Sequence, residues 1–414
     1  MAKEYLGING LGRIGKLTLW HHLSRRHFSG FVVNTGREVG KTLDDIAQVL
    51  ESDSTYGSLG GFLHGVAARG ESSVKILDSA AALFEVDGCP VKILRQARNP
   101  KDVNWRKEGV RLVVETTGTF ADPVAPGGDD KKGSLRGHLE AGAEKVINSA
   151  PFKIKDKSKK AGDDTTMLIY GINHTAFDPR KHHVISAASC TTTGLAHMMK
   201  PLLDTRETSG ILTASMSTIH AATNTQSVLD SVPKGGAADL RKTRAAFNNI
   251  ILSTTGAAQA LESVLPAIKR IGFMADSVRV PTNTVSLINL NVTFHSPLNA
   301  KGEPVINQDL INGIYRACSE GQQKGLVLFS KRQNVSSDIM GTRAAVVIEG
   351  HETHTRTGFI ELPAELLQRY EMTSQNGLRL PVTHAKIFGW YDNEYGSYTN
   401  CLGELTIYID KAMG

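Results

Sequence analysis

The sequence predicts an α/β fold in which a domain built on a parallel sheet precedes an α+β domain with a mainly antiparallel sheet. Three observations support this prediction. The N-terminal segment has the order strand, glycine turn, helix, strand, which opens a βαβ unit. Val285–Phe294 alternates apolar with polar side chains, as a half-buried antiparallel strand does. The chain has 414 residues, and at about 100–200 residues per domain this length allows two or three domains.

The composition is that of an ordinary globular protein. Hydrophobic residues make up 40% and charged residues 21%, which excludes the disordered, collagen-like and coiled-coil classes. Four scattered cysteines do not form a disulfide framework and favour a reducing compartment. The N-terminus has no apolar signal segment, and no apolar run reaches the roughly 18 residues of a membrane helix. We therefore expect a cytoplasmic protein with no membrane partner.

The net charge of +6 comes from 47 Lys and Arg residues against 41 Asp and Glu residues. Basic residues cluster only loosely, at Lys153–Lys160 and Arg241–Arg244, and no aromatic residues are interleaved with them as in a single-strand binding track. A mild surplus of this kind suits a surface that attracts phosphorylated metabolites. We do not expect nucleic acid to be the main partner.

The elements of the first domain follow from its apolar runs and turns. Tyr5–Asn9 is a short buried strand, Lys16–Leu23 has helical spacing, and Gly30–Val33 is a second strand. Further predicted elements are a helix near Leu43–Leu50, hairpin arms at Ala82–Val86 and Val91–Leu94 that turn at Asp87-Gly88, and parallel strands at Val110–Glu115 and Lys145–Asn148.

The pattern changes after Ala150. Lys153–Asp164 is charged and weakly apolar, which predicts an exposed loop, and Val184–Ala188 is a strand that leads to Ser189 and Cys190. Helical spacing of apolar residues is found at Thr191–Leu203, Gln308–Cys318 and Tyr398–Ile409.

The glycine turn has the pattern G-x-G-x-x-G, formed by Gly10, Gly12 and Gly15. Taken alone this pattern is weak, and a glycine-rich turn that only permits tight packing would show it too. Here it follows a strand and opens a helix, so backbone N–H groups at the helix start can receive a pyrophosphate. We therefore expect a Rossmann-type domain that binds NAD or NADP.

The acidic residue that would bind the ribose 2′-hydroxyl, about 20 positions beyond the glycines, is missing. Thr35 stands in its place, and Arg37 follows closely. A carboxylate would repel a 2′-phosphate, whereas a hydroxyl tolerates one and an arginine can pair with it. The site is therefore expected to tolerate NADP or to prefer it; the alternative is an Arg37 that points to solvent and a cofactor that is plain NAD.

Cys190 and His220 are the candidate catalytic pair. Cys190 follows a strand at the point where a helix begins, and a helix N-terminus stabilises a thiolate. His220 ends the apolar run that starts at Ile211, so it lies at the end of a strand. A thiol and an imidazole are the minimum for nucleophilic catalysis, although a single cysteine is often an inert core residue.

Motifs along the whole chain resemble the phosphorylating glyceraldehyde-3-phosphate dehydrogenase family. The most specific are the segment around Cys190, Ala188-Ser189-Cys190-Thr191-Thr192, and Trp390–Gly396. The other matching segments, in the same order as in the family, are Asn9–Gly15, Asp53–Gly57, Glu115–Phe120, Ser149–Pro151, Gly171–His174, His220–Gln226, Thr254–Ala258, Arg279–Pro281 and Ser336–Asp338.

The resemblance implies an enzyme that converts glyceraldehyde 3-phosphate, inorganic phosphate and NAD(P) to 1,3-bisphosphoglycerate, and a homotetramer. Cys190 would form a thiohemiacetal and then a thioester, with His220 as general base. The positions that match the family's binding residues are Ser189, Thr191, Thr255 and Arg279 for the attacking phosphate, Thr223 and Arg279 for the substrate phosphate, and Arg13, Ile14, Thr117 and Asn393 for the cofactor.

The domain division expected from these assignments has three parts. Residues 1–188 form the dinucleotide-binding domain, residues 189–389 form the catalytic domain, and residues 390–414 form a C-terminal helix that returns to the first domain. Two alternative functions stay open. One is the oxidation of another phosphorylated aldehyde such as erythrose 4-phosphate, and the other is a family relative that acts as a binding or scaffold protein.

The sequence departs from the family pattern in places besides Thr35. Thr193 stands where the family has an asparagine, and the loop after His220 is enlarged at Lys234–Ala238. The chain is also longer than typical members, mainly in residues 345–386, which are expected to form a β-arm and a helix at a subunit interface. His351 and His354 have the spacing of one helix face, but no further ligand cluster accompanies them, so we expect an exposed loop and no metal.

Overall fold

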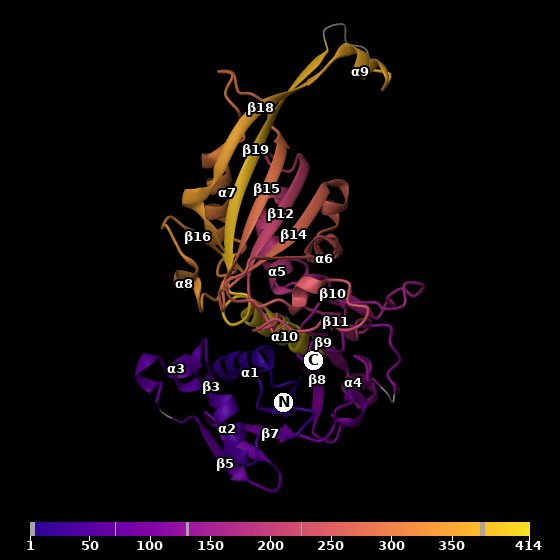
Figure 1. Cartoon of the computed structure of the whole chain (residues 1–414), viewed down its shortest axis with the longest axis vertical. Coiled ribbons are helices and arrows are strands. Elements are labelled where there is room, and N and C mark those ends of the chain that lie inside the picture. Colours follow the sequence, from indigo (N-terminus) through magenta and orange to yellow (C-terminus); the bar gives the residue numbers. More distant parts are fainter. Residues whose placement is uncertain (1–4, 71, 130–131, 225, 373–376) are drawn as a thin grey trace. The chain divides into compact units, whose positions relative to one another are not determined.

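The computed structural model describes the chain except for residues 1–4, 71, 130–131, 225 and 373–376. The fold divides into two compact units. Unit 1 comprises residues 1–190 and 394–414, and unit 2 comprises residues 191–393. The elements of each unit are labelled in Figure 1.

Unit 1 is built on a nine-stranded sheet with the order β10-β11-β9-β8-β1-β2-β7-β6-β5. From β10 to β7 all neighbouring strands are parallel, whereas β6 and β5 are antiparallel additions at one edge. Its strands are β1 (Tyr5–Asn9), β2 (Gly30–Asn34), β5 (Val74–Asp78), β6 (Leu83–Val86), β7 (Cys89–Leu94), β8 (Val110–Glu115), β9 (Lys145–Asn148), β10 (Thr165–Met167) and β11 (Val184–Ser186). This is the predicted Rossmann-type parallel sheet.

Both faces of this sheet are buried, which is why its strands are almost continuously apolar. Ile8 and Val114 contribute to a core cluster that includes Trp20 of α1 and Leu405 of α10. Val113 and Val146 belong to a second cluster on the other face, with Trp105. The helices of unit 1 are α1 (Arg13–Arg25), α2 (Leu43–Glu51), α3 (Leu59–His64), α4 (Gly137–Glu140) and α10 (Tyr398–Met413).

Unit 2 is built on a second sheet with the order β13-β14-β12-β15-β19-β17-β16, and β18 pairs with β19. Its strand pairs are antiparallel except β12 with β14 and β16 with β17. The strands are β12 (Ile211–Ala221), β13 (Ile251–Ser253), β14 (Gly272–Val280), β15 (Ser286–His295), β16 (Val327–Ser330), β17 (Val346–Glu349), β18 (His354–Leu362) and β19 (Leu378–Tyr391). The predicted mainly antiparallel sheet is therefore confirmed.

Helix α5 covers one face of this sheet, and α7 packs on α5. α5 packs closely on the sheet, because a Cβ added at Gly194 of α5 would lie 3.2 Å from Ile288 and one at Gly389 of β19 would lie 2.5 Å from Met198. Tyr315 of α7 is fully buried, and its hydroxyl donates to the carbonyl of Met198 at 2.8 Å. The helices are α5 (Cys190–Asp204), α6 (Ala257–Val264), α7 (Gln308–Glu320), α8 (Ser336–Ile339) and α9 (Ala364–Gln368).

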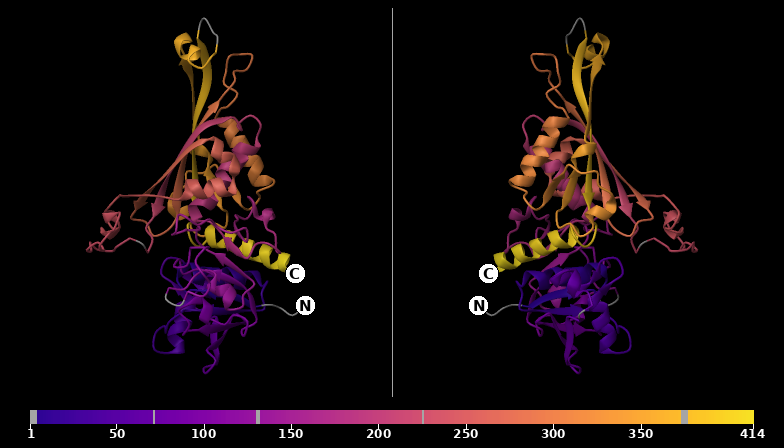
Figure 2. Two further views of the ribbon diagram at one scale, coloured as in Figure 1. Left: turned by 90° about the vertical axis from the view of Figure 1, so that its right-hand side faces the viewer. Right: turned by 90° about the vertical axis from the view of Figure 1, so that its left-hand side faces the viewer.

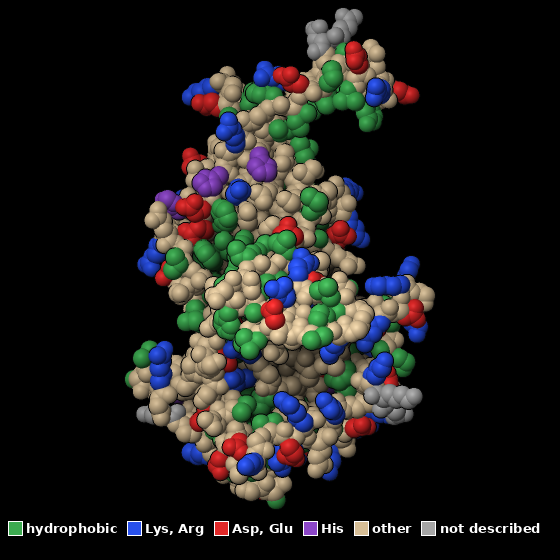
Figure 3. Space-filling view, viewed as in Figure 1, with side chains coloured by type: hydrophobic (Ala, Val, Ile, Leu, Met, Phe, Trp, Pro, Cys, Tyr) green, Lys and Arg blue, Asp and Glu red, His purple; other side chains and the backbone are tan. Residues whose placement is uncertain are grey.

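The extra segment forms an arm, as the sequence predicts. β18 and β19 pair from His354 to Leu362, and β19 extends beyond the end of β15 as a two-stranded ribbon that ends at α9 (Figures 1 and 2). Hydrophobic side chains lie along this arm in Figure 3, and Phe359 is 44% exposed. His351 and His354 do not share a helix face, because His354 begins β18.

The local predictions are confirmed with shifts at the element ends. The hairpin turn has Asp87 at φ 49° and Gly88 at φ 75°, a pair of left-handed residues typical of a tight two-residue turn. Helix α1 begins at Arg13, three residues earlier than the apolar spacing predicts, because Gly12 is its N-cap. The strand predicted to reach Ala188 ends at Ser186, because Ala188 has φ 55° and leaves the extended conformation.

Candidate active site

The glycine turn of unit 1 has the shape that a bound pyrophosphate requires. Gly10 has φ 100°, and a Cβ added at Gly15 would lie 2.1 Å from the carbonyl oxygen of Gly10, so the turn can form only with glycine at these two positions. A Cβ at Gly12 would meet nothing within 4 Å. Gly12 precedes α1, whose first N–H groups receive no side-chain cap. The turn and the helix start therefore leave room for a dinucleotide and donors to hold it.

The side chain of Arg13, a predicted cofactor residue, is held by other parts of unit 1. Its guanidinium lies 3.4 Å from Asp53, 2.9 Å from Glu394 and 3.2 Å from the hydroxyl of Thr55. Asp53 also accepts from the backbone N–H groups of Thr55 and Tyr56. Two of the motifs quoted above, Asp53–Gly57 and Trp390–Gly396, thus meet at Arg13 and fix the start of α1.

Thr35 and Arg37 follow the carboxyl end of β2. The hydroxyl of Thr35 donates to the carbonyl of Arg37 at 2.6 Å, and its own N–H donates to the carbonyl of Leu94 at 2.8 Å. Arg37 is exposed. A cleft of about 720 Å³ follows the carboxyl ends of β7 and β8, and its lining includes the cations Arg98 and Lys132. Asp102 also lines the cleft, so the described lining has two basic side chains and one acidic side chain. In parallel sheets ligands bind at this end.

Cys190 is the first residue of α5, as the sequence predicts, and it is partly exposed. The chain approaches it through Ala188, which has φ 55°, a conformation that costs energy for a residue with a side chain. The N–H of Ala188 donates to the hydroxyl of Ser186 at 3.1 Å, and its carbonyl accepts from the hydroxyl of Tyr398 at 3.4 Å. These bonds hold the turn that brings Ser189 and Cys190 to the helix start.

His220 and Arg279 form the charged centre of unit 2. They are register partners at the carboxyl ends of the parallel strands β12 and β14. Nη1 of Arg279 lies 2.6 Å from Nδ1 of His220, and both atoms contact the carbonyl of Ala221, at 3.2 Å and 2.7 Å. His220 is only 5% exposed. Burial, and then the charge of Arg279, lowers the pKa of His220 to about 4, so the ring is neutral at neutral pH.

Tyr391 connects this centre with α5. Its buried hydroxyl lies 2.8 Å from the hydroxyl of Thr191 and 2.8 Å from that of Thr218, two residues before His220. Its ring meets that of His220 edge-on at 6.1 Å between centroids. Tyr391 was not among the predicted site residues, although it lies in the specific motif Trp390–Gly396.

The other predicted residues of unit 2 lie on the loops around this centre. Asn393 is buried and accepts from the hydroxyl of Ser286 at 3.3 Å, and Ser286 in turn accepts from the N–H of Ala221 at 3.1 Å. Gln226 holds Thr223 through both its N–H and its hydroxyl, at 2.7 and 3.0 Å. Thr255 follows β13, the antiparallel partner of β14. Ser286 and Gln226 are positioning residues that sequence patterns did not indicate.

The structure thus brings the predicted residues together in two groups. Thr191, His220, Arg279 and Asn393 are linked within unit 2, and the glycine turn, Thr35 and Thr117 lie at the carboxyl ends of the sheet in unit 1. Cys190 belongs to unit 1 and His220 to unit 2, so their pairing stays a prediction.

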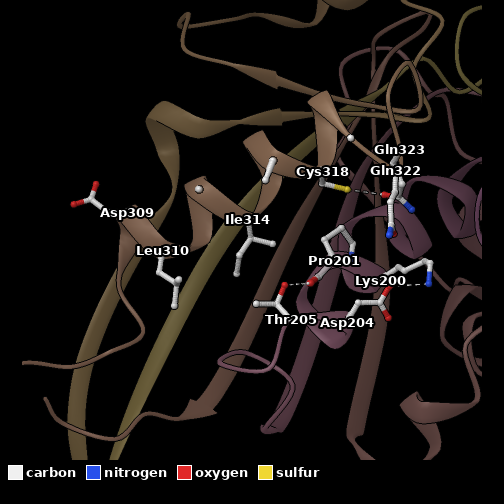
Figure 4. Close-up of a pocket in the computed structure, with 13 residues that line it drawn as sticks. Lys200, Pro201, Asp204, Thr205, Asp309, Leu310, Ile314, Cys318, Gln322 and Gln323 are labelled. Atoms are coloured by element: carbon white, nitrogen blue, oxygen red, sulfur yellow. Dashed lines mark hydrogen bonds and ion pairs between the residues drawn. The ribbon is translucent and has the colours of Figure 1, made fainter.

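The remaining thiols differ from Cys190 in their surroundings. A cleft of about 610 Å³ between α5 and α7 contains Cys318, whose thiol donates to Gln323 at 3.1 Å (Figure 4). Burial raises the pKa of Cys318 to about 11 and that of Cys401 to about 12. Thiols with such values are protonated at neutral pH and do not act as nucleophiles. The lining of this cleft contains none of the predicted site residues among those described.

The described residues contain neither a metal-binding cluster nor a membrane-spanning helix. No group of three or more His, Cys, Asp or Glu side chains there is arranged to hold a metal ion. No helix in the same part of the chain combines the length and apolar character needed to span a membrane.

Comparisons with known proteins agree with the resemblance stated above. Residues 5–123 match the family model described as glyceraldehyde 3-phosphate dehydrogenase, NAD binding domain, and residues 189–364 match the corresponding C-terminal domain. Glyceraldehyde-3-phosphate dehydrogenase 2 of Streptomyces avermitilis is 33% identical over 409 residues, which is 99% of each chain. Glyceraldehyde-3-phosphate dehydrogenase of Geobacillus stearothermophilus is 33% identical over 98% of this chain and 97% of its own. A cytosolic relative from Chlamydomonas reinhardtii is 30% identical over 99% and 98%. The chain belongs to the glyceraldehyde-3-phosphate dehydrogenase family.

Proposed function

We propose that the protein catalyses the oxidative phosphorylation of glyceraldehyde 3-phosphate by NAD(P), giving 1,3-bisphosphoglycerate. The observation that carries this proposal is the pair His220 and Arg279, which places a neutral base against a fixed positive charge at the ends of two parallel strands. Thr191, the residue after Cys190, is linked to the same centre through Tyr391. The family membership supplies the class of reaction.

The proposed reaction begins with attack of the Cys190 thiolate on the aldehyde carbon, which forms a thiohemiacetal. NAD(P), held at the glycine turn of Gly10, Gly12 and Gly15, would supply the hydride acceptor. Loss of the hydride from the thiohemiacetal would leave the acyl group on sulfur as a thioester. Inorganic phosphate then displaces the thiolate and leaves as the acyl phosphate. Cys190 starts α5, so its own N–H points out of the helix start and can stabilise the oxyanion.

His220 is proposed to take the proton from the thiohemiacetal hydroxyl. When Nδ1 carries the ring proton, it donates to the carbonyl of Ala221, and Nε2 is then the basic nitrogen. When Arg279 donates to Nδ1 instead, the proton lies on Nε2, which can then act as a donor. The two contacts require different tautomers of the neutral ring. The tautomer protonated on Nδ1 can accept the proton on Nε2, and the imidazolium that forms keeps its Nδ1 proton on the carbonyl of Ala221 and is a donor at Nε2.

Two phosphate groups need cations and hydroxyls. Arg279 is proposed to serve both, together with Thr191, Ser189 and Thr255 for the attacking phosphate and Thr223 for the phosphate of the substrate. The anchoring of Thr223 by Gln226 supports this assignment, because it fixes the hydroxyl near the loop that follows His220.

We propose that the cofactor site accepts NADP and that a 2′-phosphate is bound by Arg37. The support is the hydroxyl side chain at position 35 and the exposure of Arg37, with Arg98 and Lys132 in the neighbouring cleft. The test is kcat/KM with each cofactor for the wild type and for Thr35→Asp. We expect the ratio of NADP to NAD efficiency to fall at least about tenfold in the variant, because a carboxylate repels the phosphate. A strong preference of the wild type for NAD would contradict the proposal.

A homotetramer is proposed as the assembly. The loop between His220 and β13, with the start of that strand, exposes several large hydrophobic side chains, and Val232 is 91% exposed. The others are Val228, Leu229, Leu240, Phe247, Ile250 and Leu252. Apolar surface of this extent marks an interaction site. Sedimentation of the purified protein checks the assembly, and a monomer at working concentration would contradict it.

The proposed compartment is the cytoplasm, because all four cysteines are free thiols.

Activity is tested by following the reduced nicotinamide with glyceraldehyde 3-phosphate, or erythrose 4-phosphate, plus phosphate and either cofactor. We expect glyceraldehyde 3-phosphate to be the better substrate and Cys190→Ser to be inactive. Turnover that survives in Cys190→Ser would remove the covalent mechanism, and absence of turnover with both aldehydes would favour the binding or scaffold alternative.

A further inference from the structure

Three neighbouring parallel strands of unit 1 end in buried polar residues. Asn9 ends β1, Asn34 ends β2 and Glu115 ends β8, and they are register partners as Asn9 with Asn34 and Asn9 with Glu115. Their exposure is 3%, 2% and 0%. Apolar residues precede each of them along the strand, so these polar side chains serve a purpose other than filling the core.

Glu115 is the acceptor at the centre of this row. Its Oε2 accepts from the amide of Asn9 at 2.5 Å and from Nε2 of His138 at 3.0 Å. Its Oε1 accepts from the backbone N–H of Thr117 at 2.6 Å and from the hydroxyl of the same residue.

The direction of these hydrogen bonds is set at both ends of the row. At one end the indole N–H of Trp105, which can only donate, lies 2.9 Å from Nδ1 of His138, so His138 carries its proton on Nε2 and donates to Glu115. At the other end the carbonyl of Ala97, which can only accept, takes the amide of Asn34 at 2.9 Å. The same amide donates to Oδ1 of Asn9 at 2.7 Å, which turns the amide of Asn9 toward Glu115.

The carboxylate of Glu115 therefore receives four hydrogen bonds, two on each oxygen. Among the described residues no lysine or arginine forms an ion pair with it, and His138 is its only titratable partner. A buried carboxylate without a cation is costly unless several donors replace water. Here the donors come from the end of β1 (Asn9), from helix α4 (His138) and from the loop after β8 (Thr117).

We propose that Glu115 is the positioning residue of the cofactor site, and that its side chain holds the three loops that receive the dinucleotide in one arrangement. The loop after β8 is held directly, through Thr117. The glycine turn is held through Asn9, whose carbonyl accepts from the N–H and hydroxyl of Thr116, the residue next to Thr117. The loop with Thr35 is held through Asn34, whose Oδ1 accepts from the N–H of Gly36 at 3.3 Å. This inference rests on the proposed function only for the identity of the ligand.

The substitution Glu115→Gln tests this arrangement because it changes one oxygen to a donor. If the NH2 group of the glutamine replaced Oε2, it would face two other donors, the amide of Asn9 and the Nε2–H of His138. The amide must therefore face Thr117, whose N–H then loses its acceptor. We expect the affinity for NAD and NADP to fall about tenfold, the worth of roughly one hydrogen bond to a charged group. At saturating cofactor, kcat should change less than about threefold, because the residue touches no reacting atom.

The experiment measures cofactor binding by titration calorimetry and amide hydrogen exchange of the peptide that contains Thr117, for wild type, Glu115→Asp and Glu115→Gln. The expected affinity order is wild type, then aspartate, then glutamine, with faster exchange at Thr117 in both variants. The aspartate variant keeps the charge but is too short to reach Thr117 and Asn9 together, so it carries the test if Glu115→Gln does not fold. Asp122→Asn is the matched control, since Asp122 is a buried carboxylate that accepts from Val124 and Lys155 outside this row.

Equal affinities of wild type and variants, or a loss of the same size in Asp122→Asn, would overturn the inference. The outcome is separable from that of the proposed function. If the wild type binds neither NAD nor NADP, the proposed cofactor is wrong, whereas a wild type that binds and variants that bind equally well remove only the role of Glu115.

Discussion

The molecule builds two polar clusters at the carboxyl ends of parallel strands, and they have opposite charge. The Glu115 cluster of unit 1 (Glu115, Asn9, Asn34, His138) is centred on an anion, and all its partners donate. The Arg279 cluster of unit 2 (Arg279, His220, Thr191, Tyr391) is centred on a cation beside a neutral imidazole. The first cluster has its proton positions fixed by groups at both ends, whereas the second contains a ring whose proton can lie on either nitrogen. The Glu115 cluster is therefore suited to holding loops, and the Arg279 cluster is suited to moving protons.

The largest effect is expected from removing the base of the Arg279 cluster. His220→Asn should lower kcat by ~10²–10⁴, because the proton of the thiohemiacetal loses its acceptor. Steady-state rates with glyceraldehyde 3-phosphate measure this. His174→Asn is the control. His174 is a partly buried histidine of unit 1, and its Nδ1 accepts a hydrogen bond from the N–H of Gly171. A His220→Asn enzyme with more than about a tenth of the wild-type kcat would show that the cluster does not move the proton.

The next effect concerns the cation. Arg279→Gln should lower kcat/KM by ~10²–10³, through loss of charge stabilisation. It should also change the pH profile. Burial and Arg279 hold the pKa of His220 at about 4, and the base works only when neutral, which is above its pKa. Without the guanidinium the pKa rises, so activity is lost at a higher pH on the acid side. Rates measured across pH test the shift, and an acid limb that does not move would contradict the assignment.

A smaller effect is expected at the link between α5 and the cluster. Tyr391→Phe removes the hydroxyl shared by Thr191 and Thr218 and should raise KM for phosphate about threefold to tenfold, with a smaller change in kcat. Tyr315→Phe removes an equally buried hydroxyl, bonded to Met198, away from the cluster. It should reduce stability and leave KM for phosphate unchanged. Equal changes of KM in both variants would assign the effect to loss of packing.

The smallest effect is expected at His22, a buried titratable group that, unlike Glu115, has no hydrogen-bond partner among the described residues. His22 of α1 is fully buried, and within the described residues neither ring nitrogen has a hydrogen-bond partner. Burial, with Arg25 nearby, holds the pKa of His22 well below its usual range. The unfolded chain therefore binds more protons than the folded one, and stability falls as pH drops below about 6.5. In His22→Phe the melting temperature should fall less between neutral and mildly acid pH. An identical fall in wild type and variant would contradict this account.

Much of the fold could be predicted from the sequence because its signals are local. The glycine turn, the hairpin at Asp87-Gly88 and the alternation along Val285–Phe294 each depend on adjacent residues, and each is present in the structure. The start of α5 at Cys190 was likewise available from the strand and the polar residues before it. The predicted end of an element was wrong where a single backbone angle ends it, as at Ala188.

The supporting residues of the two clusters could not be predicted in the same way. Glu115 receives donors from Asn9 and His138, which lie 106 and 23 residues away in sequence. Tyr391 reaches Thr191 across 200 residues. Such partners follow from strand order and register, which a single sequence does not specify. A polar residue at the end of an apolar strand was the one visible signal.

The central claim, that Cys190 carries the substrate as a thioester, has a direct test. The enzyme is mixed with glyceraldehyde 3-phosphate and cofactor in the absence of phosphate, quenched in acid, digested and examined by mass spectrometry. We predict a phosphoglyceryl adduct on the peptide that contains Cys190, and its disappearance when phosphate is added before the quench. An adduct on the peptide of Cys89, Cys318 or Cys401, or reduced cofactor without any adduct, would contradict the claim.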